Sequence, residues 1–289
     1  MDYEVILYQK ANGVAHITLN RPEKLNALSA QLRAEVMDAI RESGLDEEVN
    51  AIIIKGAGRA FSAGADLTAS RAPQPDGAPR QRPTVRQDLD NLLTGLESTS
   101  RMWNSRKPVI GQIHGYCLAA ATDFILHADI LICAENTQFG FPPVRAMGTP
   151  PTHMWTYLVG PQWAKYMLFT GNSIDGKTAE RIGLVLKAVP ADELEEEANH
   201  LAETIAKVPY GLLAVHKRIV NYAIEMMGRN VVQQVAAEGD AIGHIEPSNI
   251  EFGRIAATQG IKAALEWRDG KFGDYRASQA SREARGEQA

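Results

Sequence analysis

Residues 107–141 place a run of small side chains just before one acid, a combination that could polarise a carbonyl group and move a proton. Leu118, Ala119, Ala120 and Ala121 stand where the pattern passes from strand to helix, and Asp123 follows in the first helical turn. The first N–H groups of a helix lack internal partners, so they can bind a carbonyl oxygen that gains negative charge. Asp123 could then transfer a proton beside that carbonyl. The alternative is a buried crossover whose alanines only pack, and this segment alone leaves both open.

A second segment of small residues follows the apolar run Ile52–Lys55. The sequence from Gly56 to Leu67, GAGRAFSAGADL, keeps bulky side chains away from a turning backbone, as a second close approach to a ligand would require. No Lys-Ser or Lys-Thr pair follows the glycines, and their spacing is not that of a dinucleotide fingerprint. A phosphate-binding loop is therefore excluded.

The elements that must position these segments alternate between strand and helix patterns. Asn12-Gly13 predicts a hairpin between two strand-like runs, and Ser29 can cap a helix that continues to about Arg41. The strands are expected at residues 5–9, 14–19, 51–55, 108–113 and 129–134. Strands separated by helices indicate right-handed βαβ units and a mostly parallel sheet, hence an α/β fold.

The character of the chain changes after Pro190, where the strand patterns stop. Amphipathic helical patterns are expected at residues 192–207, 212–227, 231–241 and 250–267. Their apolar faces must be covered by the core or by a neighbouring subunit. The loop Ala72–Pro83, rich in Pro, Gly, Gln and Arg, predicts either a mobile lid or a tolerated surface insertion, and the last dozen residues are expected to be disordered.

The composition is that of an ordinary globular protein. The chain has 289 residues, 45% hydrophobic residues and a net charge of −5, without a basic run, which argues against a nucleic-acid surface. No window reaches transmembrane length, and the amino terminus has acids where a signal peptide carries positive charge. The two cysteines, Cys117 and Cys133, predict buried free thiols, and no metal-ligand spacing occurs. We therefore expect a cytoplasmic protein without membrane partners.

Taken together, the motifs resemble those of the enoyl-CoA hydratase/isomerase (crotonase) family. The matching segments are 20–28, 58–67, 107–110, 114–116, 128–130, 134–136, 138–140, 168–171 and 179–185, so the match covers approximately residues 5–190 in order. The resemblance implies a crotonase-like spiral of ββα units with a helical C-terminal region. It further implies a core over residues 1–195 with the CoA-thioester site, and a region over 196–289 for trimerisation and pocket covering.

The resemblance also assigns roles to single residues. The backbone N–H groups of Ala65 and Ala120 fall at the two oxyanion-hole positions, and Asp123 falls at that of a catalytic glutamate. The positions that would contact the substrate's CoA moiety are Lys24, Leu25, Ala27, Ala63, Asp66, Leu67, Lys271 and Phe272. Coenzyme A would enter as part of an acyl-CoA substrate, without a separate cofactor, and the family's usual trimers or hexamers suggest a homo-oligomer.

The chain departs from the family pattern at the proton-transfer positions. Pro143 occupies the position of the second glutamate, and proline cannot transfer a proton. Alanines replace the usual glycines at 119–121, which is unfavourable wherever positive φ is needed, and the following Gly-rich loop is replaced by the shorter segment 148–155. Arg145 could hold a carboxylate in the acyl pocket or form a structural ion pair, and His153 could steer water or only pack.

Three functions remain open at this stage. The leading one is enoyl-CoA hydration, with Asp123 as general acid/base in a fatty-acid pathway. The second is a relative that isomerises its substrate or hydrolyses a CoA thioester or a β-dicarbonyl, using Asp123 and His153. The third is a CoA-binding member with weak or no activity, because the second acid is absent.

Overall fold

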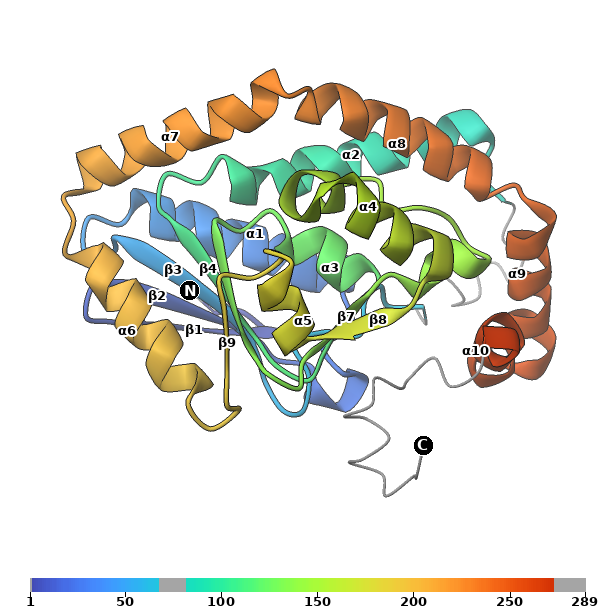
Figure 1. The fold of residues 1–289 in the computed structure, drawn as a ribbon, viewed down its shortest axis with the longest axis horizontal. Helices are drawn as coiled ribbons and strands as arrows, with labels where there is room; N and C mark the ends of the chain where they lie inside the picture. Colours follow the sequence, from blue (N-terminus) through green and yellow to red (C-terminus); the bar gives the residue numbers. More distant parts are fainter. Residues whose placement is uncertain (1, 68–81, 273–289) are drawn as a thin grey trace.

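The computed structural model describes residues 2–67 and 82–272 and has a six-stranded sheet at its centre (Figure 1). Its strands lie in the order β1-β2-β3-β4-β6-β9. They are β1 (Ile6–Ala11), β2 (Val14–Leu19), β3 (Ala51–Gly56), β4 (Val109–Ile113), β6 (Ile130–Ala134) and β9 (Lys187–Val189). The predicted loop at 72–83 lies, up to residue 81, outside the described residues, as does the tail that was expected to be disordered.

The strand directions follow the predicted pattern. The β1–β2 pair is antiparallel and all other neighbours in this sheet are parallel. Asn12 and Gly13 both have positive φ, 52° and 78°, as the two central residues of a type I′ hairpin turn require. The α/β class, the hairpin and the mostly parallel sheet are confirmed.

A small second sheet stands next to the first and carries the segment with Asp123. Its strands are β5 (Tyr116–Leu118), β7 (Gln138–Gly140) and β8 (Ser173–Asp175), in the order β5-β7-β8. An isolated bridge joins Ser62 to Cys117 at β5. This bridge aligns the loop after β3 with the strand that leads into helix α3 (Ala120–Ile125).

Helices cover both faces of the large sheet. On one face α1 (Ala30–Leu45) packs against β1, β2 and α2 (Val85–Trp103), and on the other α6 (Leu194–Ala206) packs against β3, β4 and β6. Ile52 and Ile54 accordingly belong to the core cluster of α1 and α3, whereas Ile53 belongs to the cluster of α6. Burial on both faces explains why β3 is a continuous apolar run.

The helix starts agree with the sequence. The Ser29 hydroxyl accepts a hydrogen bond from Leu32 N, as predicted for the cap of α1, which continues to Leu45 rather than Arg41. Thr84 and Gln87 form a capping box at the start of α2. The shorter elements of the core are η1 (Pro22–Lys24), η3 (Pro142–Arg145), α4 (Trp155–Thr170) and α5 (Gly176–Arg181).

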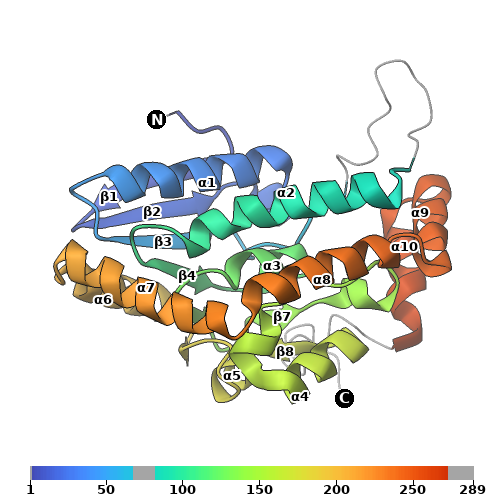
Figure 2. The same ribbon diagram turned by 90° about the horizontal axis from the view of Figure 1, so that it is seen from above.

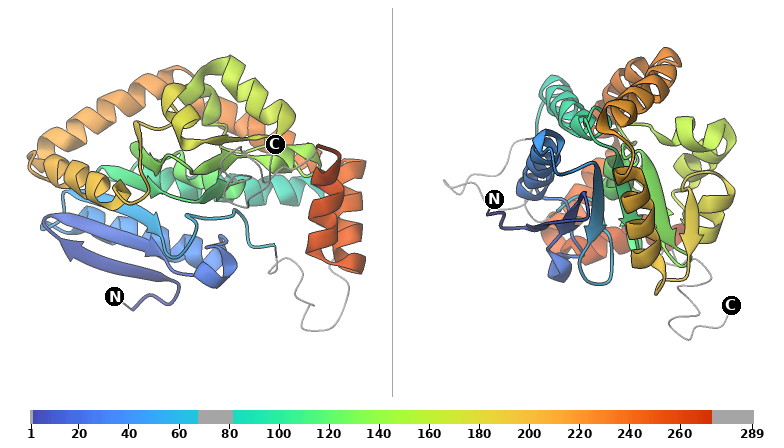
Figure 3. Two further views of the ribbon diagram at one scale, coloured as in Figure 1. Left: turned by 60° about the horizontal axis from the view of Figure 1, so that its bottom comes forward. Right: turned by 90° about the vertical axis from the view of Figure 1, so that its left-hand side faces the viewer.

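The C-terminal region is helical, as predicted. Helices α7 (Tyr210–Met226) and α8 (Arg229–Gly243) follow one another in a long arch, and α8 runs beside α2 (Figure 2). Helices α9 (Pro247–Gln259) and α10 (Ile261–Asp269), followed by η4 (Gly270–Phe272), stand beyond the ends of the strands (Figure 3, left). The continuous helix expected at 250–267 was wrong, because Gly260, with φ of 89°, separates α9 from α10.

A partly buried ion pair ties this arch to the core. Lys217 Nζ of α7 lies 2.7 Å from Asp129 Oδ2, and Val109 N donates to the same oxygen at 2.7 Å. Burial raises the pKa of Asp129 and the Lys217 ammonium opposes this shift. Asp129 thus accepts a hydrogen bond from the first backbone N–H group of β4.

The state of the two cysteines and the lengths of the apolar helices also follow from the structure. Cys117 and Cys133 are buried free thiols, as predicted. Among the described residues, no helix is both long enough and apolar enough to cross a membrane.

Replacing Lys217 by Met is expected to destabilise the fold by about 1 kcal/mol, because the partly buried Asp129 carboxylate would lose its charged partner. Urea denaturation of the variant and the parent protein measures this difference. Lys10→Met is the matched control, since Lys10 pairs with Asp46 and Glu48 at the surface and should contribute little. Equal midpoints for the two variants would contradict the anchoring role of Lys217.

Candidate active site

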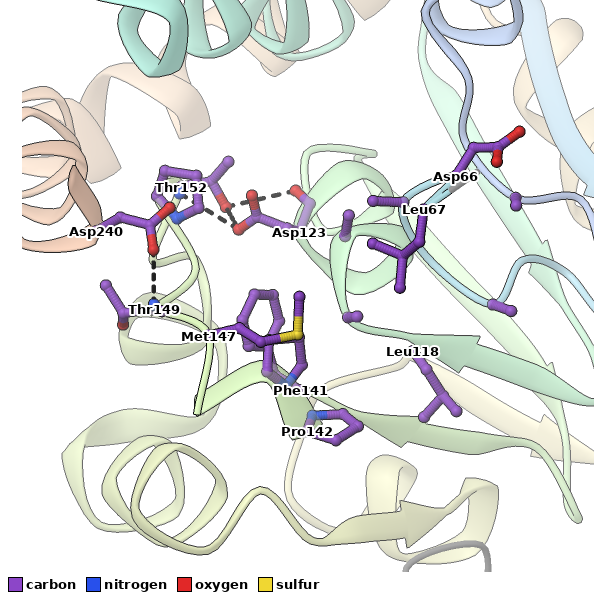
Figure 4. A pocket seen from close by; sticks show the side chains of 18 of the residues that line it. Asp66, Leu67, Leu118, Asp123, Phe141, Pro142, Met147, Thr149, Thr152 and Asp240 are labelled. Atoms are coloured by element: carbon purple, nitrogen blue, oxygen red, sulfur yellow. Dashed lines mark hydrogen bonds between the residues drawn. The ribbon is translucent and has the colours of Figure 1, made fainter. Parts of the chain in front are cut away.

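Asp123 lies in a cavity of about 680 Å³ enclosed by the core and the C-terminal helices (Figure 4). The wall is formed by the loop after β3, the β5–α3 junction, the segment 141–152, and faces of α1, α2, α8 and α10. A cavity of this size can enclose a small ligand or part of a larger one.

Two backbone N–H groups in this wall have no hydrogen-bond partner among the described residues. One belongs to Ala65: on either side of it Leu28 N donates to Gly64 O and Asp66 N donates to Leu28 O, and the N–H of Ala65 itself is left over. The other belongs to Ala120, the first residue of α3. Both residues line the cavity. Unpaired N–H groups directed at a cavity can bind an oxygen atom of a ligand, above all one that gains negative charge.

Gly64 allows these two segments to meet. A Cβ atom at this position, where φ is 104°, would lie 2.8 Å from Leu118 O and 2.9 Å from Ala119 Cβ. Only glycine permits so close an approach of the backbones together with positive φ. Gly64 therefore sets the distance between the N–H groups of Ala65 and Ala120.

The turn before α3 contains an alanine in an unfavourable conformation. Ala119 has φ of 54° and ψ of −129°, and its N–H donates to Gly140 O at 2.8 Å. Such a backbone conformation costs on the order of 1–3 kcal/mol for a residue with a Cβ atom. The steric cost of positive φ that was expected within Ala119–Ala121 therefore falls on Ala119. The Ala120 N–H remains available to a ligand.

Asp123 is buried and hydrogen-bonded to Thr152. Thr152 N donates to Asp123 Oδ1 at 3.3 Å, and the Thr152 hydroxyl donates to the same oxygen. Burial raises the pKa of Asp123 from 3.8 to about 7, while the bonds from Thr152 and the charge of Arg33 oppose the shift. A carboxyl group with this pKa can both give and take a proton near neutral pH.

Most of the positions that were expected to contact the CoA moiety lie at the same cavity. Lys24, Ala27, Ala63, Asp66 and Leu67 all line it. Leu25 does not line it. It has φ of 49° in the turn after η1, and its carbonyl oxygen accepts a hydrogen bond from Ala63 N at 2.9 Å.

Two other expected CoA contacts lie elsewhere. Lys271 and Phe272 are exposed residues of η4 and do not line this cavity, and the Phe272 ring lies 4.4 Å from the Arg145 guanidinium. Pro143, by contrast, does line the cavity, so the position of the absent acid faces the site.

Arg145 and His153 line a second cavity rather than the one that contains Asp123. The Arg145 side chain is 1% exposed, donates to Thr170 O at 2.8 Å and lies 3.2 Å from Asp269 Oδ1. Its contacts are therefore those of a structural ion pair. His153 lies 3.3 Å from the Thr156 hydroxyl, and burial lowers its pKa.

Several lining residues were not found from the sequence. Asp240 and His244 of α8, Arg33 of α1, and Thr152 all face the cavity. A signal for Asp240 did exist, because the buried positions Gln233, Ala236 and Ala237 of α8 predict that residue 240 lies on the same face. An acid on the buried stripe of an amphipathic helix would have been the clue. Among the described residues, no group of three His, Cys, Asp or Glu is placed to hold a metal ion.

Comparison with known proteins gives one consistent result. The family model for enoyl-CoA hydratase/isomerase matches residues 9–274. A probable enoyl-CoA hydratase of Mycobacterium tuberculosis is 34% identical over 236 residues, which cover 78% of this chain and 84% of the relative. A crotonyl-CoA hydratase of Syntrophomonas wolfei is 31% identical over 276 residues, which cover 94% of this chain and 99% of the relative.

Solved structures agree with the sequence comparison. A crystal structure of an enoyl-CoA hydratase from Mycobacterium smegmatis superposes with a TM-score of 0.88 at 32% identity, over 96% of this chain and 99% of that chain. One of an enoyl-CoA hydratase/isomerase from Xanthobacter autotrophicus gives a TM-score of 0.86 at 34% identity, over 94% and 99%. The expected crotonase-like fold is confirmed.

Asp123→Asn is expected to stabilise the folded protein at pH 8 by about 1–3 kcal/mol and to leave it almost unchanged below about pH 4. Since the folded-state pKa is raised, the native protein binds more protons than the unfolded chain between 3.8 and about 7, and its stability falls as pH rises through this range. Urea denaturation at several pH values measures the difference. The exposed Asp192→Asn serves as control, and a constant difference between Asp123→Asn and parent would contradict the raised pKa.

Proposed function

Because the chain belongs to the enoyl-CoA hydratase/isomerase family, we propose that it adds water across the double bond of a 2-enoyl-CoA. The observation that carries this proposal is the pair of unpaired N–H groups of Ala65 and Ala120, which line one cavity together with the buried Asp123. Oxygen binding and proton transfer are the two functions that the reaction requires.

The N–H groups would act on the thioester carbonyl. As water attacks C3, the electrons of the double bond move toward the thioester oxygen, which gains negative charge as an enolate. Donors fixed by the backbone need no reorganisation to stabilise that charge, and losing one such donor typically costs about 10²–10³ in rate. The proposal assigns this oxyanion hole to Ala65 and Ala120.

Asp123 would transfer the proton. Its pKa of about 7 leaves a substantial fraction protonated at neutral pH, so the carboxyl can deliver a proton to C2 of the enolate. The proton that the added water loses then replaces the one that Asp123 has given. Ala63, Asp66, Leu67 and Lys24 at the cavity wall are the proposed contacts of the CoA moiety. Coenzyme A arrives as part of the substrate, and the reaction as written needs no further cofactor.

One version of the hydrolytic alternative has His153 acting with Asp123 to steer water. His153 lines the second cavity, where it lies beside Thr156, so a water held by this side chain would not face Asp123. This placement argues against a part for His153 in the reaction.

We also propose that the chain forms a homo-oligomer, as a trimer or hexamer. Helix α7 has no buried residue along its 17 residues and exposes a row of apolar side chains. The exposed residues are Leu212, Val215, Ile219, Val220, Tyr222 and Met226. An apolar helix face of this length is typical of a surface that another chain covers.

Light scattering coupled to size-exclusion chromatography tests the assembly. The expected result is a mass of three or six chains, and Ile219→Glu should lower it by placing a charge on the face of α7. Glu238→Arg, an exposed change on α8, is the control for a general effect of altered charge. A parent protein that elutes with the mass of one chain would contradict the proposal.

Hydration of crotonyl-CoA is tested by the loss of absorbance of the conjugated enoyl thioester. The parent protein should consume crotonyl-CoA without releasing free thiol, and Asp123→Asn should slow the reaction by about 10²–10⁴ because the acid/base group is removed. Binding of butyryl-CoA, measured by calorimetry, should persist in the variant.

Other outcomes point to other reactions. Release of free CoA would identify a hydrolase. Binding of butyryl-CoA without any consumption of crotonyl-CoA would contradict the hydration of this substrate.

A further inference from the structure

A second carboxyl group, that of Asp240, faces the cavity that contains Asp123 (Figure 4). Asp240 lies on α8, and its side chain is 7% exposed. Thr149 N donates to Asp240 Oδ1 at 2.8 Å, and Thr152 N of the same segment donates to Asp123 Oδ1. One short loop therefore holds both carboxyl groups through its backbone.

The position of Asp240 depends on a close contact with Gly148. A Cβ atom on Gly148 would lie 2.1 Å from Asp240 Oδ1, so any larger residue would displace the carboxyl group. The backbone of this loop also packs on α8, since a Cβ atom on Gly243 would lie 3.3 Å from Gly148 Cα. The loop that replaces the family's usual Gly-rich segment is thus fitted to α8 and its acid.

The two carboxyl groups affect each other electrostatically. Burial raises the pKa of Asp240 to about 6, and the charge of Asp240 contributes to the raised pKa of Asp123. Two like charges at one cavity favour a state in which the pair retains a single proton. The other charged or titratable residues that line this cavity, among those that the structure describes, are Lys24, Arg33, Asp66, His244 and Arg268, and Asp88 of α2 lies against His244.

His244 connects Asp240 to the rim of the cavity. Its Nε2 lies 3.6 Å from Asp240 Oδ1 and its Nδ1 lies 2.6 Å from Asp88 Oδ2. The His244 side chain is 35% exposed, so it meets solvent on one side and the buried carboxyl group on the other. His244 therefore stands between Asp240 and the solvent.

We propose that Asp240 is the second proton-transfer group of this site, acting with Asp123 in place of the acid that is absent at Pro143. The inference rests on the proposed hydration and adds a group that the sequence pattern of the core does not contain. It assigns to the C-terminal region a direct part in the reaction.

The step balances if Asp123 is protonated and Asp240 is ionised at the start of the reaction. The ionised Asp240 removes a proton from water while the water oxygen forms its bond to C3. The π electrons of the double bond pass toward the thioester, and C2 takes the proton of Asp123. Asp240 then carries a proton and Asp123 a negative charge, and exchange through His244 and solvent restores the starting state.

The test compares Asp240→Asn with Glu238→Gln, an exposed acid two residues away on the same helix. Asp240→Asn is expected to lower the rate of crotonyl-CoA hydration by about 10²–10⁴ and to leave the affinity for butyryl-CoA within about threefold. Glu238→Gln should leave both unchanged. Hydration by Asp240→Asn within about threefold of the parent would overturn the proposal.

The pH dependence separates a proton-transfer role from a structural one. The parent should show a bell-shaped profile, because the active pair holds one proton and is inactive with two or none. Asp240→Asn should lose the acidic limb, and its remaining limb should move to lower pH because a negative charge near Asp123 is gone. An unchanged bell would overturn the proposal.

A second variant covers the case in which Asn at position 240 perturbs folding. Asp240→Ala leaves space for a small carboxylate, so formate should restore a measurable part of the lost activity in a concentration-dependent manner. Loss of activity in both variants that formate does not restore, together with lost butyryl-CoA binding, would assign Asp240 a structural role and overturn the proposal.

Failure of the proposed function is recognised separately. If the parent does not hydrate crotonyl-CoA, infrared titration of the carboxyl bands still measures how Asp123 and Asp240 are protonated as pH changes. Two coupled steps in the parent and a single step at lower pH in Asp240→Asn would support the shared proton. Identical titration of Asp123 in both proteins would overturn this inference as well.

Discussion

The site depends on one close approach of two backbones, at Gly64. The loop after β3 and the turn before α3 come from different parts of the chain, and a single Cβ atom at Gly64 would meet Leu118 O at 2.8 Å. The contact brings Ala65 and Ala120 to the wall of one cavity. The bridge between Ser62 and Cys117 joins the same two segments a few residues away. The parallel sheet, the strained Ala119 and the first turn of α3 all serve to present these two donors.

Enclosure of the cavity changes the chemistry of its acids. Burial by the core and the C-terminal helices together raises the pKa of Asp123 to about 7, and α8 brings Asp240 to the same cavity. Burial of a carboxyl group is unfavourable for folding, and contacts such as the ion pair of Lys217 with Asp129 hold the C-terminal helices on the core.

The sequence predicted most of what depends on local pattern. The hairpin at Asn12-Gly13, the cap at Ser29 and the all-apolar strand β3 follow from turn geometry, capping and burial, which act over a few residues. That Ala65, Ala120 and Asp123 lie at one site was expected only through the family resemblance, because their spacing in the sequence does not indicate that they are close in the fold. The break between α9 and α10 was missed because Gly260 interrupts an otherwise continuous helical pattern.

The side chains that sequence reasoning placed less well are those whose partners come from distant elements. Arg145 stands close in sequence to the absent acid, yet its side chain turns to Asp269 of the C-terminal helices. Asp240 lies on the buried stripe of α8, a sequence signal that marks it as buried but does not say which cavity it faces, and it reaches this cavity because Gly148 and Gly243 let the loop and the helix touch. Such contacts depend on how α8 docks, which no local pattern encodes.

The donors that we propose for the oxyanion hole are main-chain atoms, and this has a consequence for how such a site can change. Substitutions at Ala65 or Ala120 alter a small side chain but leave the N–H in place, whereas each acid is lost by a single change of codon. Donors of this kind therefore tolerate side-chain substitution, whereas a proton-transfer role depends on which element supplies the acid. Two relatives with the same alignment can then catalyse different reactions, and the residue that distinguishes them can lie on a helix that the shared motif does not include.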